Sequence, residues 1–303
     1  MQAEADVVQQ HRSHLLGVAY RLTGTLADAE DAVQEAWLRL ARLPDADQAA
    51  IRDPRGWLTT VVGRLCLDRL RSATVQRERY VGPWLPEPLV TRLDGPVNPL
   101  DEVVRDDGVR MAALVVLERL TPEQRVAFVL HDTLNVPFTE IADVLGCSVP
   151  AARQHASRAR RAVASADPPP RVDLAQQRQV LDAFLTALAG GDLAALVSVL
   201  HPDAAVIGDG GGKERTARRP VRGADQVARF VLGLQQRYGL KRLGAAQLVL
   251  VNGDLGMVIP AWPGDAEHPS IAGRVSCFAV RDGKVAAIYD IANPDKLGRT
   301  FSL

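Results

Sequence analysis

Residues 151–163 combine four arginines with a glutamine, a serine and no acidic side chain. Arginine can bind phosphate oxygens or the guanine edge, and glutamine can pair with adenine, so this composition suits contact with DNA. The side chains predicted to face a duplex are Arg153, Gln154, Ser157, Arg158, Arg160 and Arg161. Arg153 and Gln154 lie nearest the helix start and are the predicted base contacts, whereas the later arginines are the predicted phosphate contacts.

The residues around this basic face predict two helices joined by a tight turn. Apolar side chains recur at helical spacing from Phe138 to Leu145, Gly146 suits a left-handed C-terminal cap, and Ser148 suits the next N-cap. Small residues then form the inward stripe of the second helix, namely Val149, Ala152, Ala156, Ala159 and Val163. This pattern predicts a helix-turn-helix. The arginines alone would also fit a solvated helix face or a helical hairpin that binds protein.

Two proline-rich segments divide the 303 residues into three blocks. The predicted domain limits are 1–80, a linker at 81–101, 102–165, a short spacer at 166–171, and 172–303. The first two blocks are predicted to be all-helical. In the first, Thr25 is the expected N-cap of a second helix, and Asp53-Pro54 is expected to start a third.

The third block mixes helical and strand patterns, which predicts an α+β, cone-like domain with a curled antiparallel sheet. Its predicted helices cover about 173–189 and 192–200. Its predicted strands are Ala204–Ile207, Gln247–Val251, Leu255–Pro260, Arg274–Arg281 and Lys284–Ile291.

The bulk composition excludes several classes of protein. Three distant cysteines argue against a disulfide framework, and the sequence has no clustered Cys/His pattern, so no metal and no cofactor are expected. The chain shows no signal-peptide pattern and no apolar run of membrane length, which predicts a cytoplasmic protein without a membrane partner. The net charge is zero, but the charges are segregated. Residues 28–35 carry four acids and no base, whereas residues 52–79 carry seven arginines and three acids.

Two parts of the chain together resemble one known family. LTPEQRVAFVLHD, with FTEIADVLGCSVPAARQHASRARRAV after it, resembles the C-terminal DNA-binding domain of extracytoplasmic-function (ECF) sigma factors. GTLADAEDAVQEAWLRL and DPRGWLTTVVGRLCLDRLRS resemble the N-terminal sigma domain, in the same order and at fitting distances. The resemblance implies a transcription initiation factor that binds core RNA polymerase and promoter DNA, without catalysis of its own.

The resemblance also implies roles for the segregated charges. The acidic helix would dock on the clamp coiled-coil of the polymerase largest subunit, through Asp28, Asp31, Gln34 and Glu35. The third helix would capture the downstream promoter element and help to open the duplex, through Trp57, Arg64, Arg69 and Arg71. The helix-turn-helix would then read the upstream element. Without the family, the acidic stripe reads simply as a solvent face with acids near a helix N-terminus.

The third block exceeds the usual two-domain plan and resembles the SnoaL-like, nuclear-transport-factor-two-like domain fused to one subgroup of these factors. Three segments carry this likeness: Trp84-Leu85-Pro86-Glu87-Pro88-Leu89, Asp209-Gly210-Gly211-Gly212-Lys213, and Asn293-Pro294-Asp295-Lys296-Leu297. The resemblance implies a built-in regulator, and we expect it to pack against the linker. A small-molecule ligand of this domain is a further possible partner.

Two other functions fit parts of the sequence. One is a ligand-responsive helix-turn-helix regulator that binds an operator without polymerase, which leaves the first block unexplained. The other is a cyclase- or isomerase-like enzyme, because that fold includes enzymes whose apolar pockets hold an Asp or His base. Candidate catalytic side chains would be His201, Asp203, Asp209, His268, Tyr289 and Asp290.

Overall fold

The computed structural model describes residues 2–77, 80–93, 109–298 and Thr300, with only the backbone given for 2–9, 74–77 and 242–243. The chain folds into two compact units. The first contains residues up to 78 together with 97–109 and 113–168, and the second contains 79–96, 110–112 and 169–303. Both predicted helical blocks therefore contribute to the first unit, whereas the predicted linker contributes to the second. Residues 94–108, which include the end of that linker, lie outside the described residues.

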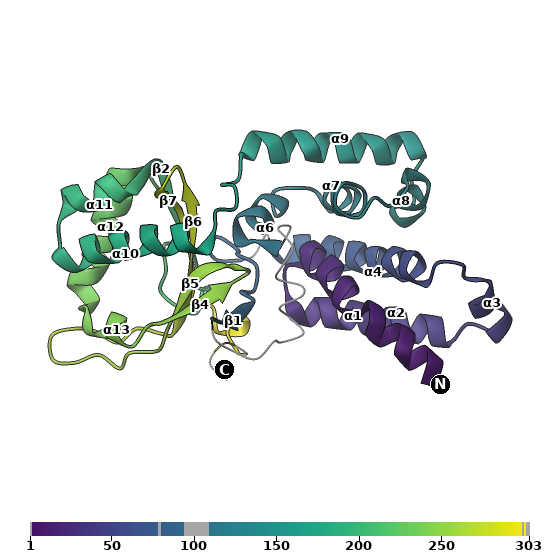
Figure 1. Cartoon of the computed structure of the whole chain (residues 1–303), viewed down its shortest axis with the longest axis horizontal. Coiled ribbons are helices and arrows are strands. Elements are labelled where there is room, and N and C mark those ends of the chain that lie inside the picture. The colour runs from purple at the N-terminus through teal and green to yellow at the C-terminus, as the bar shows by residue number, and fades with distance from the viewer. Residues whose placement is uncertain (1, 78–79, 94–108, 299, 301–303) are drawn as a thin grey trace. The chain divides into compact units, whose positions relative to one another are not determined.

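In the first half of the helical unit, long helices lie side by side and run in opposite directions (Figure 1). Its helices are α1 (Gln2–Thr23), α2 (Leu26–Ala41), α3 (Asp45–Ala50) and α4 (Pro54–Arg77). Each long helix buries an apolar face: Leu15 and Leu22 of α1, Ala29 of α2 and Leu58 of α4 are fully buried. Thr25 caps α2 as predicted, because its side chain accepts a hydrogen bond from the Asp28 backbone amide.

The second half of the helical unit contains the helix-turn-helix. Its helices are α6 (Met111–Leu117), α7 (Pro122–Phe128), a π-helical turn η2 (Val129–Thr133), α8 (Phe138–Leu145) and α9 (Val149–Ala166). Thr121 and Gln124 form a reciprocal capping box at the start of α7. Gly146 ends α8 in the left-handed conformation, with φ 64°, and Ser148 caps α9 three residues after α8 ends. The predicted helix-turn-helix is therefore present.

The second unit is built on a seven-stranded mixed sheet in the order β1-β4-β5-β6-β7-β2-β3. The strands are β1 (Val90–Arg92), β2 (Leu200–Asp209), β3 (Val221–Arg222), β4 (Gln247–Val251), β5 (Asp254–Ile259), β6 (Arg274–Arg281) and β7 (Lys284–Ile291). Strand β1 comes from the predicted linker and pairs antiparallel with β4, so a segment between the two helical blocks is the edge strand of the C-terminal sheet.

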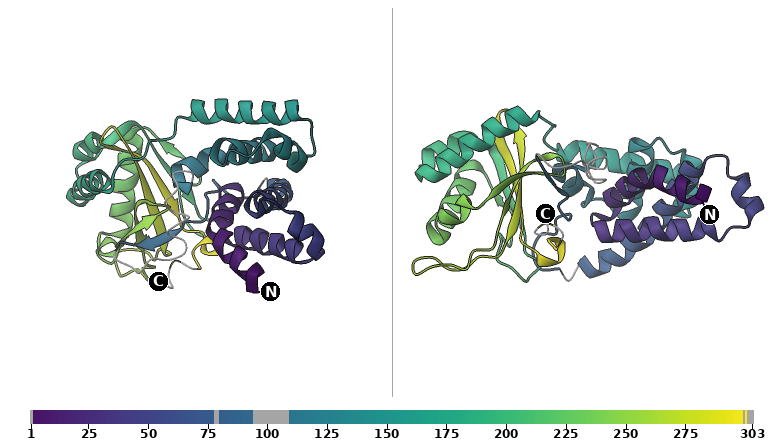
Figure 2. Two further views of the ribbon diagram at one scale, coloured as in Figure 1. Left: turned by 45° about the vertical axis from the view of Figure 1, so that its right-hand side comes forward. Right: turned by 60° about the horizontal axis from the view of Figure 1, so that its bottom comes forward.

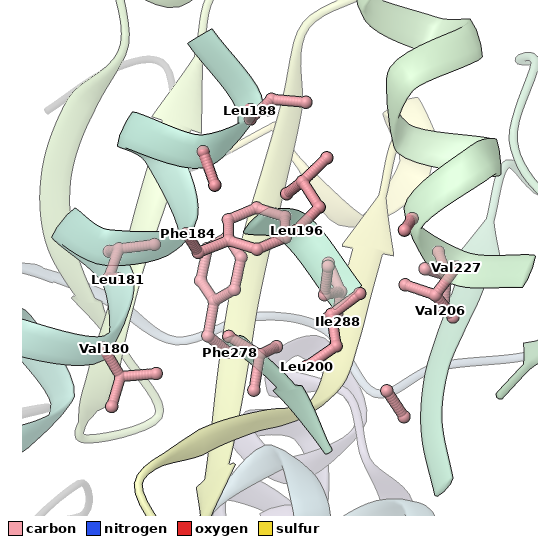
Figure 3. Packing of buried hydrophobic residues seen from close by; sticks show 14 of the residues in the cluster. Val180, Leu181, Phe184, Leu188, Leu196, Leu200, Val206, Val227, Phe278 and Ile288 are labelled. Carbon is pink, nitrogen blue, oxygen red and sulfur yellow. The ribbon is translucent and has the colours of Figure 1, made fainter. Parts of the chain in front are cut away.

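Helices cover one face of this sheet (Figures 1 and 2). They are α10 (Leu174–Gly190), α11 (Leu193–Val199) and α12 (Ala224–Tyr238); the short α13 (Lys241–Gly244) and a 3-10 turn η3 (Pro294–Lys296) complete the unit. The core lies between the helices and the sheet, where the rings of Phe184 and Phe278 meet at 5.9 Å between centroids (Figure 3). This is the α+β arrangement that the sequence predicts.

The sheet differs from the prediction in two respects. It was predicted to be antiparallel throughout, but β2 and β7 pair in parallel. The reason is topological: β3, α12 and the strands β4 to β6 lie between these two strands in the chain, so β7 can return beside β2 in the same direction. The second difference is that α12 follows β3, so the helices do not all precede the sheet.

Candidate nucleic-acid interface

The basic face of α9 is exposed. Arg153, Gln154, Arg158, Arg160 and Arg161 are exposed and Ser157 is half-buried, whereas Ala152, Ala156 and Ala159 are fully or almost fully buried on the opposite side. Small side chains on the inward stripe let α9 approach α7 and α8 closely, and the long basic side chains are left on the outside.

Local contacts divide the arginines of α9 into two kinds. The Arg153 guanidinium lies 5.7 Å from the centroid of the Phe138 ring, which orients it near the start of the helix. The Arg160 guanidinium forms an ion pair with Asp132 of η2. Among the described residues, Arg153, Arg158 and Arg161 form no ion pair, so their charges are available to an outside anion. Arg160 must exchange Asp132 for a phosphate before it can contact DNA.

The acidic side chains of α2 lie at the surface. The Asp31 side chain is 67% exposed, Gln34 is exposed, and Glu35 forms an exposed ion pair with Arg39 one turn later. Asp28 accepts a 2.5 Å hydrogen bond from the Thr25 hydroxyl. The four side chains therefore form one polar stripe on the outside of the helical unit.

Each arginine that the sequence assigned to downstream DNA has a protein partner in this structure. Arg69 donates to the Asp28 carbonyl oxygen at 2.9 Å and lies 3.5 Å from the Asp31 carboxylate. Arg64 donates to the Asp143 carbonyl oxygen of α8 at 3.0 Å. Arg71 donates to the Glu123 carboxylate of α7 at 3.1 and 3.2 Å. Trp57 is half-buried on the same helix.

Helix α4 therefore packs against the helix-turn-helix half of the unit. The Thr60 hydroxyl donates to the Glu140 carboxylate at 3.3 Å. Gly63 lies so close to Leu130 that a Cβ atom there would be 3.1 Å from the leucine methyl. The hydrogen bonds of Arg64 with α8 and of Arg71 with α7 belong to the same interface. Two of the predicted DNA contacts of α4, Arg64 and Arg71, are therefore bound to the helix-turn-helix half, although both side chains remain exposed.

A buried arginine holds the two halves of the helical unit together, and the sequence analysis did not single it out. Arg125 of α7 is 1% exposed. Its Nε and one terminal nitrogen donate to the Arg21 carbonyl oxygen at the end of α1, at 3.0 and 2.8 Å, and its other nitrogen pairs with Glu118. The guanidinium thus satisfies a C-terminal carbonyl of α1 that has no intrahelical donor. An arginine in the first turns of an amphipathic helix looks like any surface residue, so the sequence carries no signal for this role.

The second unit holds the linker through a buried polar contact. The Asp209 carboxylate is fully buried and accepts hydrogen bonds from the Tyr80 hydroxyl at 2.5 Å and the Leu85 amide at 2.8 Å. Lys296 donates to the same carboxylate at 2.7 Å and also to the Leu85 carbonyl oxygen. Its ammonium group lies 3.9 Å from the centroid of the Trp84 ring. We call the group Tyr80, Trp84, Leu85, Asp209 and Lys296 the linker contact.

The three predicted regulatory segments meet at the linker contact. Asn293 donates to the Tyr80 hydroxyl at 2.8 Å, and Gly211, with φ 61°, lies so close to the Asn293 side chain that a Cβ atom would clash at 2.6 Å. Burial is the largest cause that raises the pKa of Tyr80 well above its usual value, and the hydrogen bond to Asp209 is the next. The phenol therefore keeps its proton at neutral pH.

The other residues of these segments differ in exposure. Lys213 and Asp295 form an exposed ion pair at 2.6 Å. Leu85, Pro86, Pro88, Gly210 and Leu297 are buried, Trp84 and Glu87 are half-buried, and Gly212 and Pro294 are exposed.

Two further contacts, farther along the chain, bind residues near the linker to the second unit. The Leu89 amide donates to the Asn252 side chain at 3.1 Å just before β1. Beyond the segment 94–108, Arg110 is buried and donates to the Asp254 carboxylate at 2.8 Å, and Gln177 donates to the other oxygen of that carboxylate at 3.1 Å. Burial raises the pKa of Asp254 even though Arg110 opposes the shift. The residues on both sides of 94–108 are thus held by the second unit.

The candidate catalytic residues do not come together. His201 lies 3.9 Å from Asp282, Asp203 is exposed, and His268 contacts Asp265 at 3.0 Å. Asp209 belongs to the linker contact. Asp290 is the one candidate whose side chain lines the large cavity of the second unit, and its carboxylate is held by Arg274 at 2.9 Å.

Comparison with known proteins identifies two regions of the helical unit. Residues 7–75 match the family model described as Sigma-70 region 2, and residues 110–163 match the model described as Sigma-70, region 4. These regions contain α2 with most of α4 and the helix-turn-helix, respectively, so both halves of the helical unit match regions of sigma factors.

Relatives extend this similarity over the whole chain. The chain is 56% identical over 299 residues to the ECF RNA polymerase sigma factor SigJ of Mycobacterium tuberculosis, covering 97% of this chain and 93% of that protein. It is 42% identical over 229 residues to the probable ECF RNA polymerase sigma factor SigI of the same species, covering 73% of each. The crystal structure of M. tuberculosis SigJ superimposes with a TM-score of 0.82 and 53% identity over 98% of both chains. The chain belongs to the family of extracytoplasmic-function RNA polymerase sigma factors.

The similarity to SigJ over almost its entire length includes the third block, so the two sigma regions and the C-terminal α+β domain occur together in both proteins. In the described part of the chain, no helix combines the length and apolar character that crossing a membrane requires.

Proposed function

We propose that the chain binds core RNA polymerase and directs promoter-specific transcription initiation, and that its own C-terminal domain modulates this activity. The observation that carries the proposal is the separation of an acidic stripe on α2 from an exposed basic face on α9 within one sigma-type unit. The partners are core polymerase and promoter DNA, which places its action in the cytoplasm. The chain acts by binding, without catalysing a reaction.

The purified chain mixed with core RNA polymerase tests this proposal against the two alternatives. We expect a stable complex on size-exclusion chromatography and transcripts that depend on one class of promoter. Operator binding with equal strength in the absence of polymerase would favour the ligand-responsive regulator instead. Turnover of a keto substrate by the chain alone would favour the enzyme.

Base reading by α9 gives a prediction about promoter preference. The Arg153→Ala variant should relax the preference at one position of the upstream element, at a cost of ~1–3 kcal/mol for the preferred base. The measurement is binding of holoenzyme to promoters substituted one position at a time. Arg158→Ala is the matched comparison, because a phosphate contact should weaken all promoters equally and reduce the salt dependence by about one unit. Uniform weakening by Arg153→Ala would contradict base reading.

The acidic stripe of α2 gives a prediction about polymerase binding. Asp31→Asn removes an exposed charge without changing the shape of the side chain, and we expect affinity for core polymerase to fall by about fivefold to tenfold at low salt. Competition binding at two salt concentrations measures the change. Asp47→Asn on α3 is the control, since Asp47 is also exposed but lies outside the stripe. An equal loss in both variants would mean that α2 is not the docking surface.

The contacts of α4 with the helix-turn-helix half support a closed state of the free chain. Arg64 and Arg71 bind α8 and α7 here, and Leu130 packs on Gly63. We infer that the two sigma regions must separate before α4 can hold single-stranded promoter DNA. Separation costs the exposed hydrogen bonds of Arg64 and Arg71 and the packing of Leu130 on Gly63, and binding to core polymerase is the event that can supply that free energy.

The linker contact supports a regulatory role for the third block. The linker joins the two sigma regions in the sequence, and its residues 80–92 are bound to the C-terminal sheet from Tyr80 to β1. We propose that the third block controls how far apart the two sigma regions can move by holding or releasing this segment. A small molecule bound by the third block could then change the spacing of the two sigma regions and so alter transcription.

A further inference from the structure

The second unit contains a cavity of about 800 Å³, within the size range of ligand-binding pockets in proteins. Its inner wall is apolar and comes from the helices and the sheet together. Phe184 and Leu188 of α10, Val206 of β2, and Phe278 and Ile288 of the central strands line it (Figure 3). A compact core would have filled this space, because protein interiors pack at the density of organic crystals.

The polar groups of the cavity are mainly cationic. Five basic side chains line it against two acidic ones, Glu214 and Asp290. Arg215, Arg218 and Arg237 are exposed, and no ion pair neutralises them among the described residues. A ligand in the cavity would therefore meet three positive charges that no carboxylate of the described residues pairs with.

One arginine lies deeper, on the sheet. Arg274 is 5% exposed, and its three nitrogens donate to Asp290 at 2.9 Å and to two backbone oxygens at 3.4 Å. A guanidinium has five N–H groups, so two remain without a partner among the described residues. Ser276 donates to the second oxygen of Asp290 at 3.3 Å. Both carboxylate oxygens of Asp290 therefore accept a hydrogen bond, whereas Arg274 keeps N–H groups that no described residue accepts. A planar guanidinium with free donors matches a carboxylate.

The linker forms part of the cavity wall. Val81 and Gly82 line the cavity beside Gly210 and Gly212, whose neighbour Asp209 holds Tyr80 and Leu85. Gly212 lies directly against Val81, since a Cβ atom on it would be 3.1 Å from the Val81 Cβ atom. An occupant of the cavity would thus touch the linker between Tyr80 and Trp84, two residues of the linker contact.

We propose that this cavity binds an apolar organic acid, with its carboxylate at the arginines and its apolar body against the aromatic wall, and that the occupant stabilises the linker on the second unit. The regulatory half rests on the function proposed above. The binding half does not, because it depends only on the shape and charge of the cavity.

Titration of the full chain with decanoate and 1-naphthoate tests the ligand class. Saturable binding of either acid is expected, with decanol and decyltrimethylammonium bound at least about tenfold more weakly. Equal binding of the neutral alcohol, or no saturable binding of either acid, would overturn the proposal. Transcription with core polymerase, measured in parallel on the same preparation, reports separately on the proposed function.

Two kinds of variant assign the site. Leu234→Trp fills the cavity from α12 and should abolish binding. Arg215→Gln combined with Arg218→Gln removes two exposed charges and should weaken the acids about tenfold while leaving decanol unchanged. Arg219→Gln combined with Arg222→Gln is the matched control, because both arginines are exposed on the same segment but do not line the cavity. Equal weakening by the two pairs would mean nonspecific attraction.

Hydrogen exchange of residues 80–92 tests the coupling. A saturating acid should slow exchange at the Leu85 and Leu89 amides at least about threefold in the wild-type chain and leave it unchanged in Leu234→Trp. Unchanged exchange in the wild-type chain despite saturable binding would overturn the link between cavity and linker.

Discussion

Replacing Arg125 by methionine is expected to lower the free energy of unfolding of the helical unit by ~3–5 kcal/mol, the usual cost of removing one partner from a buried ion pair. The substitution leaves the Glu118 carboxylate without its cation and the Arg21 carbonyl oxygen without two donors. Urea unfolding followed by circular dichroism measures the change. Arg119→Met is the control, since Arg119 is exposed on the same stretch of chain. A loss below about 1 kcal/mol would show that the buried pair contributes little.

The same variant separates a structural role from a gating role. If Arg125 holds the two sigma regions closed, Arg125→Met should expose α4, and the free chain should bind single-stranded promoter DNA more tightly than the wild type. Fluorescence anisotropy with a labelled oligonucleotide measures this below the unfolding range. Glu123→Gln weakens only the exposed contact with Arg71 and leaves that arginine in place, so it should give the same direction with a smaller effect. Unchanged DNA affinity in folded Arg125→Met would contradict the closed state.

Asp209→Asn should release the linker from the second unit and lower its stability by ~3–5 kcal/mol, because Lys296 would remain buried without its counter-ion. Lys296→Met should have a comparable effect through the uncompensated carboxylate. The double variant should be less destabilised than the sum of the two, since replacing both charges of a buried pair removes the penalty of an unpaired charge. The measurements are urea unfolding and hydrogen exchange at the Leu85 amide, which donates to Asp209.

Lys213→Met provides the matched control for this pair of variants. Lys213 and Asp295 belong to the same two sequence segments, but both side chains are more than half exposed. An exposed ion pair contributes about 0–1 kcal/mol, so Lys213→Met should leave the exchange of Leu85 unchanged. In transcription with core polymerase, Asp209→Asn should alter promoter output while Lys213→Met does not. Identical behaviour of the two variants would show that charge at these segments, rather than the buried contact, governs regulation.

Much of the local structure could be predicted from the sequence because it depends on neighbours in the chain. Gly146 and Ser148 set the turn of the helix-turn-helix through a left-handed cap and an N-cap, and each acts within about four residues. The alanines of α9 could be assigned to its buried side by spacing alone. The same local signals located three of the C-terminal strands, β4, β6 and β7, at their exact limits.

The linker shows what local reasoning leaves out. Its prolines and lack of periodicity predict an extended segment, and residues 81–92, in the described part of the linker, are extended. Nothing within residues 81–93 indicates that Val90–Arg92 become the edge strand beside β4, because the pairing partner is about 160 residues away. The parallel pairing of β2 with β7 went unpredicted for the same reason.

The sequence by itself determined the chemistry of this protein: an acidic α2, arginines on α4 and α9, and the small residues that leave the basic face of α9 outside. Only the tertiary structure decided which of those charges are available. Arg153 and Arg158 are left to solvent, while Arg64 and Arg71 are bound by α8 and α7, and Asp209 and Lys296 become partners across 87 residues of chain. The physical reason is that residue type and spacing set what a side chain can bind, whereas burial and pairing depend on surfaces that meet only when distant segments pack.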